Sequence, residues 1–254
     1  MMVDFYKFKN FSNLVHCSHA ITTKDMHEPY AFSVALHTGE NKEKIVTNRK
    51  KIAFLLGWKK NIHFVIANQT HSDNIEIIDK NDNLGWERHE DAVANCDALI
   101  TNTKGIVLSV LTADCVPILL LDTKKNVIAT VHAGWKGTKL EIVSKTVKRM
   151  IEAFDSNPKD IIAGIAPSIG ACCYEVDEDV AKHFFNVPNA YLKKGKKYML
   201  DLPIINKQQL IQSGLHESNI EMSNICTACE VDTFFSYRKE NGCSGRFMSM
   251  IGLN

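Results

Sequence analysis

Three short segments of the chain each place a good metal-binding side chain beside an apolar run. The segments are NQTHSDNI, LTADCVP and TVHAGW, and they offer His71, Cys115 and His132. Taken alone, a histidine or cysteine at a strand end is more often a packed or hydrogen-bonded residue than a ligand. Together, two imidazoles and one thiolate suit Zn²⁺, and three protein ligands leave the fourth tetrahedral position for water or substrate. The residues therefore indicate a catalytic metal site, provided that the fold brings them together.

Two of these side chains belong to adjacent strands. The runs PILLLD and VIATVH are separated only by the polar residues TKKN, so we expect an antiparallel hairpin. If Asp122 faces Lys125 across a two-residue turn, Cys115 lies opposite His132, at the roughly 5 Å typical of facing residues. A longer turn shifts the pairing by one or two positions. Every such register leaves Cys115 and His132 near the same end of the sheet.

Two further residues flank this pair. Asp114 precedes the cysteine and is expected to orient a ligand or to handle a proton, although a solvated acid or a backbone cap is an equally good interpretation. The GWKGT turn after His132 leads into a helical pattern, whose free N–H groups and Lys136 are expected to hold an anion such as phosphate. A plain strand-to-helix loop is the competing interpretation of this turn.

The chain has eight cysteines, spread irregularly through its length, which favours reduced thiols over a disulfide framework. Cys226 and Cys229 have the C-x-x-C spacing of redox or zinc motifs. There is only one such pair, without a thioredoxin-like βαβ context, so we interpret both as turn residues. Cys172 and Cys173 adjoin the GIAPSIG strand and turn, where alternation would send one inward and one outward. We assign these four cysteines no chemistry.

The elements that must position the candidate ligands are mostly short strands. Apolar, β-branched segments predict strands at HFVIA, NIEIID, CDALIT, GIVLSVLT, PILLLD, VIATVH, IIAGIA, TFFSY and RFMSMIG. Helical spacing predicts one helix over EKIVTNRKKIAFLL that ends at Gly57, and another from about Thr138 to Phe154. DEDVAKHFF and PIINKQQLIQSG are also helical in pattern, and the opening HAITTKDMHEPYAFSVALHTGE is expected to be mostly loop. Several strands are too close together for helical crossovers, so we expect an α/β chain with mixed, largely antiparallel sheets.

Composition limits the classes of partner. With 254 residues, of which 45% are hydrophobic, and no linker-like segment, residues 1–254 are expected to form a single domain. A formal net charge of +1, without a run of five like charges, disfavours nucleic acid and anionic membranes as partners. No signal-peptide pattern and no stretch of about 18 apolar residues is present. We therefore expect a cytoplasmic protein that acts on small neutral or singly charged molecules.

Eight segments, in this order, resemble the laccase-domain family, also called the multicopper polyphenol oxidase or purine-nucleoside phosphorylase family. They are VTNRKK, NQTHS, CDALIT, LTADCVPILL, VHAGWKGT, GIAPSIGACCYEV, ICTAC and FFSYRKE with GRFMSMIGL. HAGW together with TADC and a Q-x-H is a specific combination, and the match spans nearly the whole chain. The resemblance implies a layered α/β/β/α sandwich with zinc held by His71, Cys115 and His132.

The resemblance also implies an activity. Members of this family phosphorolyse adenosine, inosine and methylthioadenosine to free base and a ribose 1-phosphate, and deaminate adenosine. On this basis Cys115 and Asp114 are the expected catalytic residues, and Arg49, Arg238 and Arg246, together with Lys136, are the expected contacts to phosphate or ribose. An ordinary ion-pair partner is the competing interpretation of each arginine.

Local departures affect the loop and anion contacts. Ser72 stands where the family often has glycine, Ala35 where it has asparagine, and Lys136 where it has arginine, whose bidentate fork lysine cannot reproduce.

Other functions are weighed against this one. None of the ten histidines forms the His-x-His pairs of a multicopper cluster, so copper is the less favoured metal and polyphenol oxidation is disfavoured. The facing pair also suits a zinc-free hydrolase with Cys115 as nucleophile and His132 as base. A metal- or ligand-binding protein without turnover is the third alternative. The preferred nucleoside and the oligomeric state do not follow from the sequence.

Overall fold

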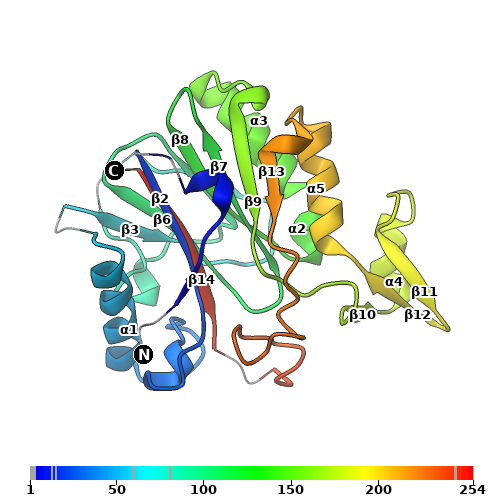
Figure 1. The fold of residues 1–254 in the computed structure, drawn as a ribbon, viewed down its shortest axis with the longest axis horizontal. Helices are drawn as coiled ribbons and strands as arrows, with labels where there is room; N and C mark the ends of the chain where they lie inside the picture. The colour runs from blue at the N-terminus through cyan, green and yellow to red at the C-terminus, as the bar shows by residue number, and fades with distance from the viewer. Residues whose placement is uncertain are drawn as a thin grey trace.

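Two stacked β-sheets form the centre of the molecule in the computed structural model, which describes residues 4–12, 14, 16–58, 61–79, 82–242 and 245–253 (Figure 1). The five-stranded sheet has the order β1 (Phe5–Tyr6), β2 (Cys17–Thr22), β14 (Phe247–Leu253), β6 (Ile106–Thr112) and β3 (His63–Ile66). The six-stranded sheet has the order β13 (Ile220–Met222), β9 (Ile161–Ile165), β7 (Val116–Asp122), β8 (Val127–Ala133), β5 (Ala98–Thr101) and β4 (Ile75–Ile77). Most pairs are antiparallel; β3 with β6, β4 with β5 and β9 with β13 are parallel.

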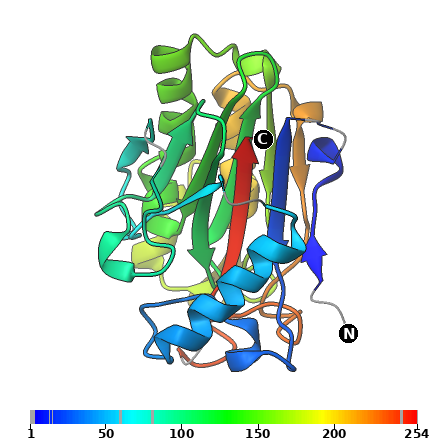
Figure 2. The same cartoon turned by 90° about the vertical axis from the view of Figure 1, so that its left-hand side faces the viewer.

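Helices cover the outer faces of both sheets. Helix α1 (Lys42–Leu55) crosses the five-stranded sheet, as Figure 2 shows, and α3 (Ile142–Phe154) and α5 (Leu202–Gln212) lie on the six-stranded sheet. Shorter helical elements are α2 (Trp135–Lys139), α4 (Glu178–Ala181) and the 3₁₀ turns Lys9–Phe11, Pro29–Phe32, His89–Asp91, Pro158–Asp160, Lys182–Phe184 and Glu217–Asn219. The sandwich of mixed, largely antiparallel sheets predicted from the sequence is therefore confirmed.

A third, small sheet lies at the edge of the molecule. It pairs β10 (Glu175–Val176), β12 (Lys197–Leu200) and β11 (Tyr191–Lys194), and with α4 it projects beyond the end of the sandwich (Figure 1).

Three apolar cores separate the layers. The core between the two sheets includes Leu108, Leu119 and Ile251, all fully buried. A second core lies under α3 and α5, and a third lies under α1. Both faces of the central strands are thus buried, which explains why β6, β7 and β8 are continuous apolar runs in the sequence. Among the helices of the described ranges, none is long and apolar enough to cross a membrane.

The hairpin between β7 and β8 forms, but in a different register from the one predicted. Asp122 pairs with Val127 rather than facing Lys125, and Pro117 is the residue opposite His132. The Asp122 carboxylate accepts hydrogen bonds from the N–H groups of residues 124 and 125, at 2.8 and 2.9 Å, and so closes a four-residue turn. The pairing is shifted by two positions, and Cys115 lies just before β7 instead of directly opposite His132.

Other predictions of local structure are corrected in part. The helix expected from Thr138 to Phe154 is interrupted, because Glu141 adopts a left-handed conformation (φ 59°) between α2 and α3. TFFSY forms turns rather than a strand, and the HAIT of the opening segment belongs to β2. Helix α1 ends before Gly57 as predicted, with Gly57 itself at φ 68°.

Candidate active site

His71 lies on the loop by which the chain crosses from β3, in one sheet, to β4, in the other. Its backbone is left-handed (φ 61°), a conformation that is uncommon outside glycine but is adopted by histidine more often than by most residues. The buried carboxylate of Asp97 holds this loop, because it accepts hydrogen bonds from the N–H groups of Thr70, His71 and Ser72 at 3.2, 3.1 and 2.7 Å. Ser72 adds a hydroxyl donor at 2.6 Å. The loop that carries His71 is therefore held in place by one acidic side chain, Asp97.

The same carboxylate orients the second histidine. His132 is on β8, only 3% exposed, and its Nδ1 lies 2.7 Å from Oδ1 of Asp97. That contact leaves Nε2 to face Cys115 and His71. A carboxylate on the outer nitrogen is the usual arrangement for a histidine that binds a metal. Sequence reasoning gave an orienting role to Asp114 and missed Asp97, whose only signal was an acid placed immediately before the apolar strand β5.

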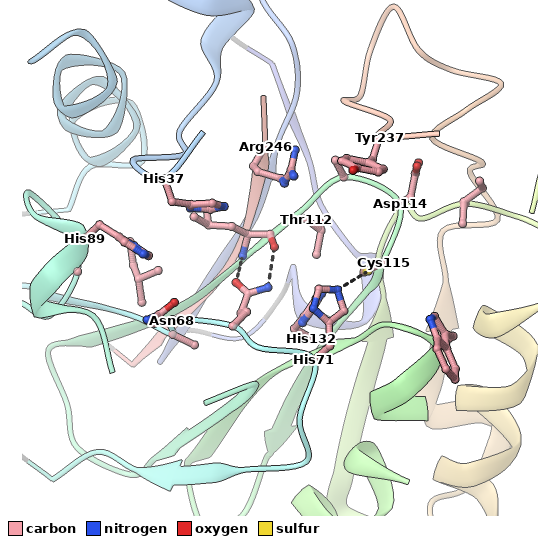
Figure 3. Close-up of a pocket in the computed structure, with 18 of the residues that line it drawn as sticks. His37, Asn68, His71, His89, Thr112, Asp114, Cys115, His132, Tyr237 and Arg246 are labelled. Carbon is pink, nitrogen blue, oxygen red and sulfur yellow. Dashed lines mark hydrogen bonds between the residues drawn. The ribbon is translucent and has the colours of Figure 1, made fainter. Parts of the chain in front are cut away.

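Cys115 completes the group from the tight crossover between β6 and β7. Its Sγ is 3.7 Å from Nε2 of His71, and the ligand atoms of His71, Cys115 and His132 all lie within 4.8 Å of one another (Figure 3). A tetrahedral zinc ion with ordinary bond lengths separates a sulfur and a nitrogen ligand by about 3.6 Å. The three predicted ligands are thus brought together at spacings that could hold a metal ion.

Gly134 is the residue that leaves room for this group. A Cβ atom at this position would lie 2.9 Å from Cδ2 of His71 and 3.1 Å from Sγ of Cys115. Both distances are shorter than ordinary van der Waals contact, so any side chain would push two ligands apart. The glycine of the HAGW segment is thus required by close packing rather than by its backbone conformation.

Gly134→Ala is therefore expected to lower zinc affinity by about tenfold or more, because His71 and Cys115 must move to admit the methyl group. Competition against a chromophoric chelator measures this affinity. Gly137→Ala is the matched control, since the nearest atoms to its Cβ would be Cγ2 of Ile142 at 3.3 Å and the backbone oxygens of Ser72 and His132 at 3.4 and 3.5 Å, none of which is a candidate ligand atom. Equal zinc affinity in wild type and Gly134→Ala would contradict the prediction.

Without a metal ion, Cys115 and His132 shift each other's pKa in opposite directions. Burial raises the pKa of the Cys115 thiol, but the charge and hydrogen bond of His132 outweigh it and bring that pKa below its usual value. Burial by itself lowers the pKa of His132. The contacts with Cys115 and Asp97 have a larger, opposite effect, so the pKa of His132 is raised overall. The pair therefore favours a thiolate, which is the form of cysteine that binds metal ions.

A cavity of about 590 Å³ opens above the three side chains. This volume is within the range of small-molecule sites. Figure 3 shows His37, His89 and Asn68 on one side of the cavity and Arg246, Tyr237 and Asp114 on another. A second cavity, of about 240 Å³, adjoins His71 and Cys115 and is also lined by Trp135, Lys136 and Leu202. Two of the three candidate ligands therefore line both cavities, and His132 lines the larger one only.

The predicted substrate contacts are distributed unevenly around these cavities. Arg49 lines the large cavity but is only 1% exposed, and its guanidinium donates to the carbonyl oxygens of Val34, Gly85 and Trp86 at 2.6–2.8 Å. It therefore holds the cavity lining together. Lys136 is exposed and lies at the smaller cavity.

Two arginines and one acid lie close to the large cavity. Arg246 is half-buried, with its guanidinium 5.7 Å from the ring centre of Tyr237. Arg238 is exposed, donates to the carbonyl oxygen of Glu175 at 2.8 Å and lies over the ring of Tyr174. The Asp114 carboxylate accepts hydrogen bonds at 2.7 Å from the Thr227 hydroxyl and from the backbone N–H group of Arg238. Its role in proton transfer stays a prediction.

Comparison with known proteins agrees with the fold and the segments described above. A family model described as multi-copper polyphenol oxidoreductase laccase matches residues 18–254. The chain is 35% identical over 229 residues to the purine nucleoside phosphorylase YlmD of Bacillus subtilis, covering 88% of this chain and 82% of that protein. It is 34% identical over 223 residues to adenosine deaminase RL5 of an unknown prokaryotic organism, with 85% and 84% coverage.

Solved structures show the same architecture. YlmD from Geobacillus stearothermophilus superposes with a TM-score of 0.91 at 30% identity, over 100% of both chains. The protein YfiH of Bacillus licheniformis superposes with a TM-score of 0.88 at 36% identity, over 94% of this chain and 93% of that one. The resemblance noted from HAGW, TADC and Q-x-H is confirmed, and the chain belongs to the multi-copper polyphenol oxidoreductase laccase family, with purine nucleoside phosphorylases of the YlmD type among its relatives.

Proposed function

We propose that this protein is a zinc-dependent purine nucleoside phosphorylase that acts on adenosine, inosine and methylthioadenosine, with adenosine deamination as a side activity. The observation that carries the proposal is the group of His71, Cys115 and His132 beneath a cavity of about 590 Å³. The names of two relatives, a purine nucleoside phosphorylase and an adenosine deaminase, support it.

The donor set fits zinc better than a copper cluster. Two imidazoles and a thiolate leave one tetrahedral position open, and Asp97 fixes the tautomer of His132 through its Nδ1. When bound, zinc supplies Lewis-acid polarisation and lowers the pKa of a water molecule. Multicopper oxidation needs several coupled copper sites, and the described residues provide one His₂Cys group.

Aromatic side chains of the large cavity are suited to a purine. Tyr174, Tyr237 and Trp135 line it together with His37 and His89. Stacking of a base on an aromatic ring contributes about 1–3 kcal/mol in other base-binding proteins and tolerates different bases. This tolerance agrees with a site that accepts adenosine, inosine and methylthioadenosine.

Phosphorolysis joins a phosphate oxygen to C1′ of the ribose while the bond from C1′ to the purine nitrogen breaks. The bonding electrons leave with the base, which takes up a proton, and the products are free base and ribose 1-phosphate. In this proposal the phosphate is bound by Arg246, which is half-buried and lines the large cavity. Arg238 and Arg49 complete the cationic lining of this cavity, and Asp114 lies beside Cys115 as the candidate for proton transfer.

Arg246→Ala is expected to raise the KM for phosphate by about 10- to 100-fold, since a charged hydrogen bond contributes about 1.5–3 kcal/mol. Initial rates at varied phosphate and saturating adenosine measure this change. Lys136, which the sequence suggested as a phosphate contact, lies at the smaller cavity and does not line the large one. With phosphate held by Arg246, Lys136→Ala is expected to leave the KM for phosphate within about twofold of the wild-type value. The reverse pattern would place the phosphate in the smaller cavity.

The proposal is tested by incubating metal-analysed protein with adenosine, with and without phosphate, and separating adenine, inosine and hypoxanthine by chromatography. Adenine that forms only with phosphate supports phosphorolysis, and inosine formed without phosphate supports deamination. No product from adenosine, inosine or methylthioadenosine, despite bound zinc, would contradict the proposal.

A zinc-free cysteine hydrolase is the second candidate, favoured by the lowered pKa of Cys115 and the raised pKa of His132. In that enzyme the thiolate would attack the substrate and the imidazolium would protonate the leaving group. Chelation separates the two functions, because it would leave the hydrolase active and would inactivate the phosphorylase.

A further inference from the structure

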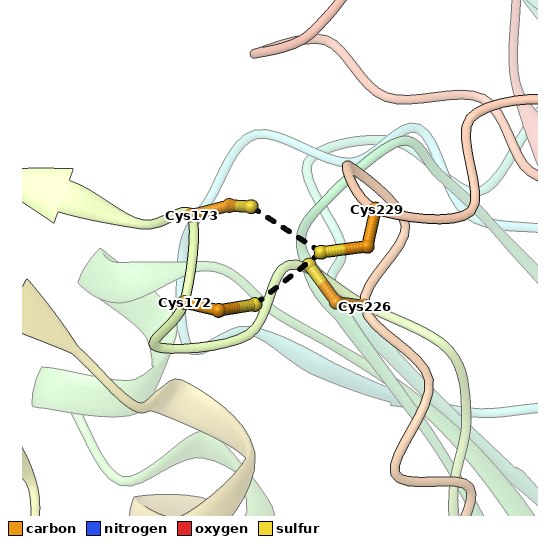
Figure 4. A group of neighbouring side chains, drawn as sticks. All are labelled: Cys172, Cys173, Cys226 and Cys229. Carbon is orange, nitrogen blue, oxygen red and sulfur yellow. Dashed lines mark hydrogen bonds between the residues drawn. The ribbon is translucent and has the colours of Figure 1, made fainter.

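Four cysteines outside the candidate active site converge near the surface. Figure 4 shows Cys172 and Cys173 facing Cys226 and Cys229, from two segments more than fifty residues apart in the chain. Sγ of Cys229 is 3.6 Å from that of Cys172 and 3.5 Å from that of Cys173, and all four sulfur atoms lie within 4.8 Å of one another. From the sequence these four cysteines were assigned no chemistry, and their convergence was not predicted.

The spacing of the sulfur atoms distinguishes between two explanations. A disulfide requires two sulfur atoms at about 2.05 Å, and these pairs are about 1.5 Å farther apart. A tetrahedral zinc ion with four thiolate ligands separates each pair of sulfur atoms by about 3.8 Å, given a zinc–sulfur bond of about 2.3 Å. The contacts of 3.5 and 3.6 Å that Cys229 makes with Cys173 and Cys172 are close to that value. The spacing therefore matches metal coordination.

Backbone hydrogen bonds build the two turns that present the sulfur atoms. The N–H groups of Cys173 and Tyr174 both donate to the carbonyl oxygen of Gly170, at 3.0 Å. The N–H groups of Cys229 and Glu230 both donate to the carbonyl oxygen of Cys226, at 3.1 and 2.9 Å. Residues 171–173 form a turn rather than a strand, so neighbouring side chains need not alternate, and Cys172 and Cys173 can face the same point.

Contacts between the two turns fix their relative position. Ser168 and Cys226 form a parallel bridge, and the N–H group of Thr227 donates to the carbonyl oxygen of Ser168 at 3.1 Å. The N–H group of Gly170 donates to Sγ of Cys226 at 3.3 Å, a contact that stabilises a thiolate. The ligand geometry is thus set by the backbone, without requiring the metal to gather distant loops.

We propose that Cys172, Cys173, Cys226 and Cys229 bind a second zinc ion in a closed, structural site. Four thiolates are soft ligands that select zinc over magnesium or calcium, and they leave no open position for substrate. Cys172 and Cys229 are exposed, so zinc can reach the site from solvent.

The position of this site assigns it a role in shaping the active site. Thr227, inside the second turn, donates its hydroxyl to Asp114, and the N–H group of Ile169, just before the first turn, donates to the carbonyl oxygen of Asp114 at 2.9 Å. Tyr174, directly after the first turn, lines both cavities. Zinc between the turns would therefore hold the loop that carries Asp114 and Cys115.

The test is zinc per chain, measured by elemental analysis of protein purified under reducing conditions and dialysed against metal-free buffer. Two zinc ions are expected in wild type and in Cys17→Ser, the control that removes a buried cysteine from β2. One is expected in His71→Ala/His132→Ala, which retains only the four-cysteine site, and one in Cys172→Ser/Cys229→Ser, which retains only the active site. A single zinc in wild type that is lost in His71→Ala/His132→Ala would overturn the proposal.

A second measurement detects the site directly in protein that retains all four cysteines. Cobalt added to metal-free His71→Ala/His132→Ala is expected to give the intense sulfur-to-cobalt charge-transfer absorption of a tetrahedral thiolate site, at one equivalent per chain. Loss of this absorption in the same protein with Cys226→Ser assigns it to the cluster. Absence of the absorption in reduced, folded protein that retains all four cysteines would overturn the proposal.

Discussion

Replacing Cys115 with alanine is expected to lower both zinc affinity at the active site and the rate of phosphate-dependent adenine release by about a hundredfold or more. Cys115 supplies the only thiolate among the three ligands, and its loss leaves two histidines of which one is exposed. Zinc titration and steady-state kinetics on the same preparation measure the two effects.

The matched control for this variant is Cys17→Ala, which removes a thiol from β2 that lines neither cavity. It is expected to retain wild-type zinc affinity and activity. Activity in Cys115→Ala within a few-fold of wild type would show that the thiolate neither binds the essential metal nor acts as a nucleophile.

Asp97→Asn is expected to lower zinc affinity, activity or both by about 10- to 100-fold, the usual effect of removing the partner of a metal-binding histidine. The Asp97 carboxylate contacts Nδ1 of His132 and accepts hydrogen bonds from three backbone N–H groups of the loop that carries His71. An amide at this position carries no charge to balance the histidine, and its NH₂ group cannot accept the loop's hydrogen bonds.

Ser72→Ala provides a graded comparison for this variant. It removes one hydroxyl donor from Asp97 and leaves the contact with His132 in place. Its effect is expected to be smaller, about two- to tenfold, since the hydrogen bond to Asp97 contributes about 0.5–1.5 kcal/mol and the N–H donors to Asp97 remain. The variant also removes the weaker contact from the Asn74 N–H group to the Ser72 hydroxyl, at 3.2 Å. An effect of Ser72→Ala equal to that of Asp97→Asn would show that the loop, rather than the orientation of His132, sets zinc affinity.

The sheets were predictable from the sequence because buried strands require continuous apolar runs. The segments of β6, β7 and β8 are such runs, and each was placed within a residue or two of its observed bounds. The register of the β7–β8 hairpin was not predictable in the same way. The register depends on the Asp122 carboxylate, which closes the turn by accepting hydrogen bonds from two backbone N–H groups. Hydrophobic patterning does not show which hydrogen bonds a side chain makes.

The sequence could predict only those residues of the candidate site whose side chains are themselves typical metal ligands. His71, Cys115 and His132 carry that signal in their side chains, and family resemblance joins them. Asp97 carries none, because an acid before a strand is common and its role arises from contacts with two other segments. The four-cysteine cluster was missed because Cys172 and Cys226 are far apart in sequence and meet only through turns.

Zinc-dependent phosphorolysis is tested most directly by the rate of phosphate-dependent adenine release from adenosine by metal-stripped protein, before and after zinc is added back. We expect negligible release before addition, recovery of the wild-type rate with zinc, and no recovery in Cys115→Ala. Full activity without metal, or adenine release that is equally fast without phosphate, would contradict the proposal that zinc at His71, Cys115 and His132 supports phosphorolysis.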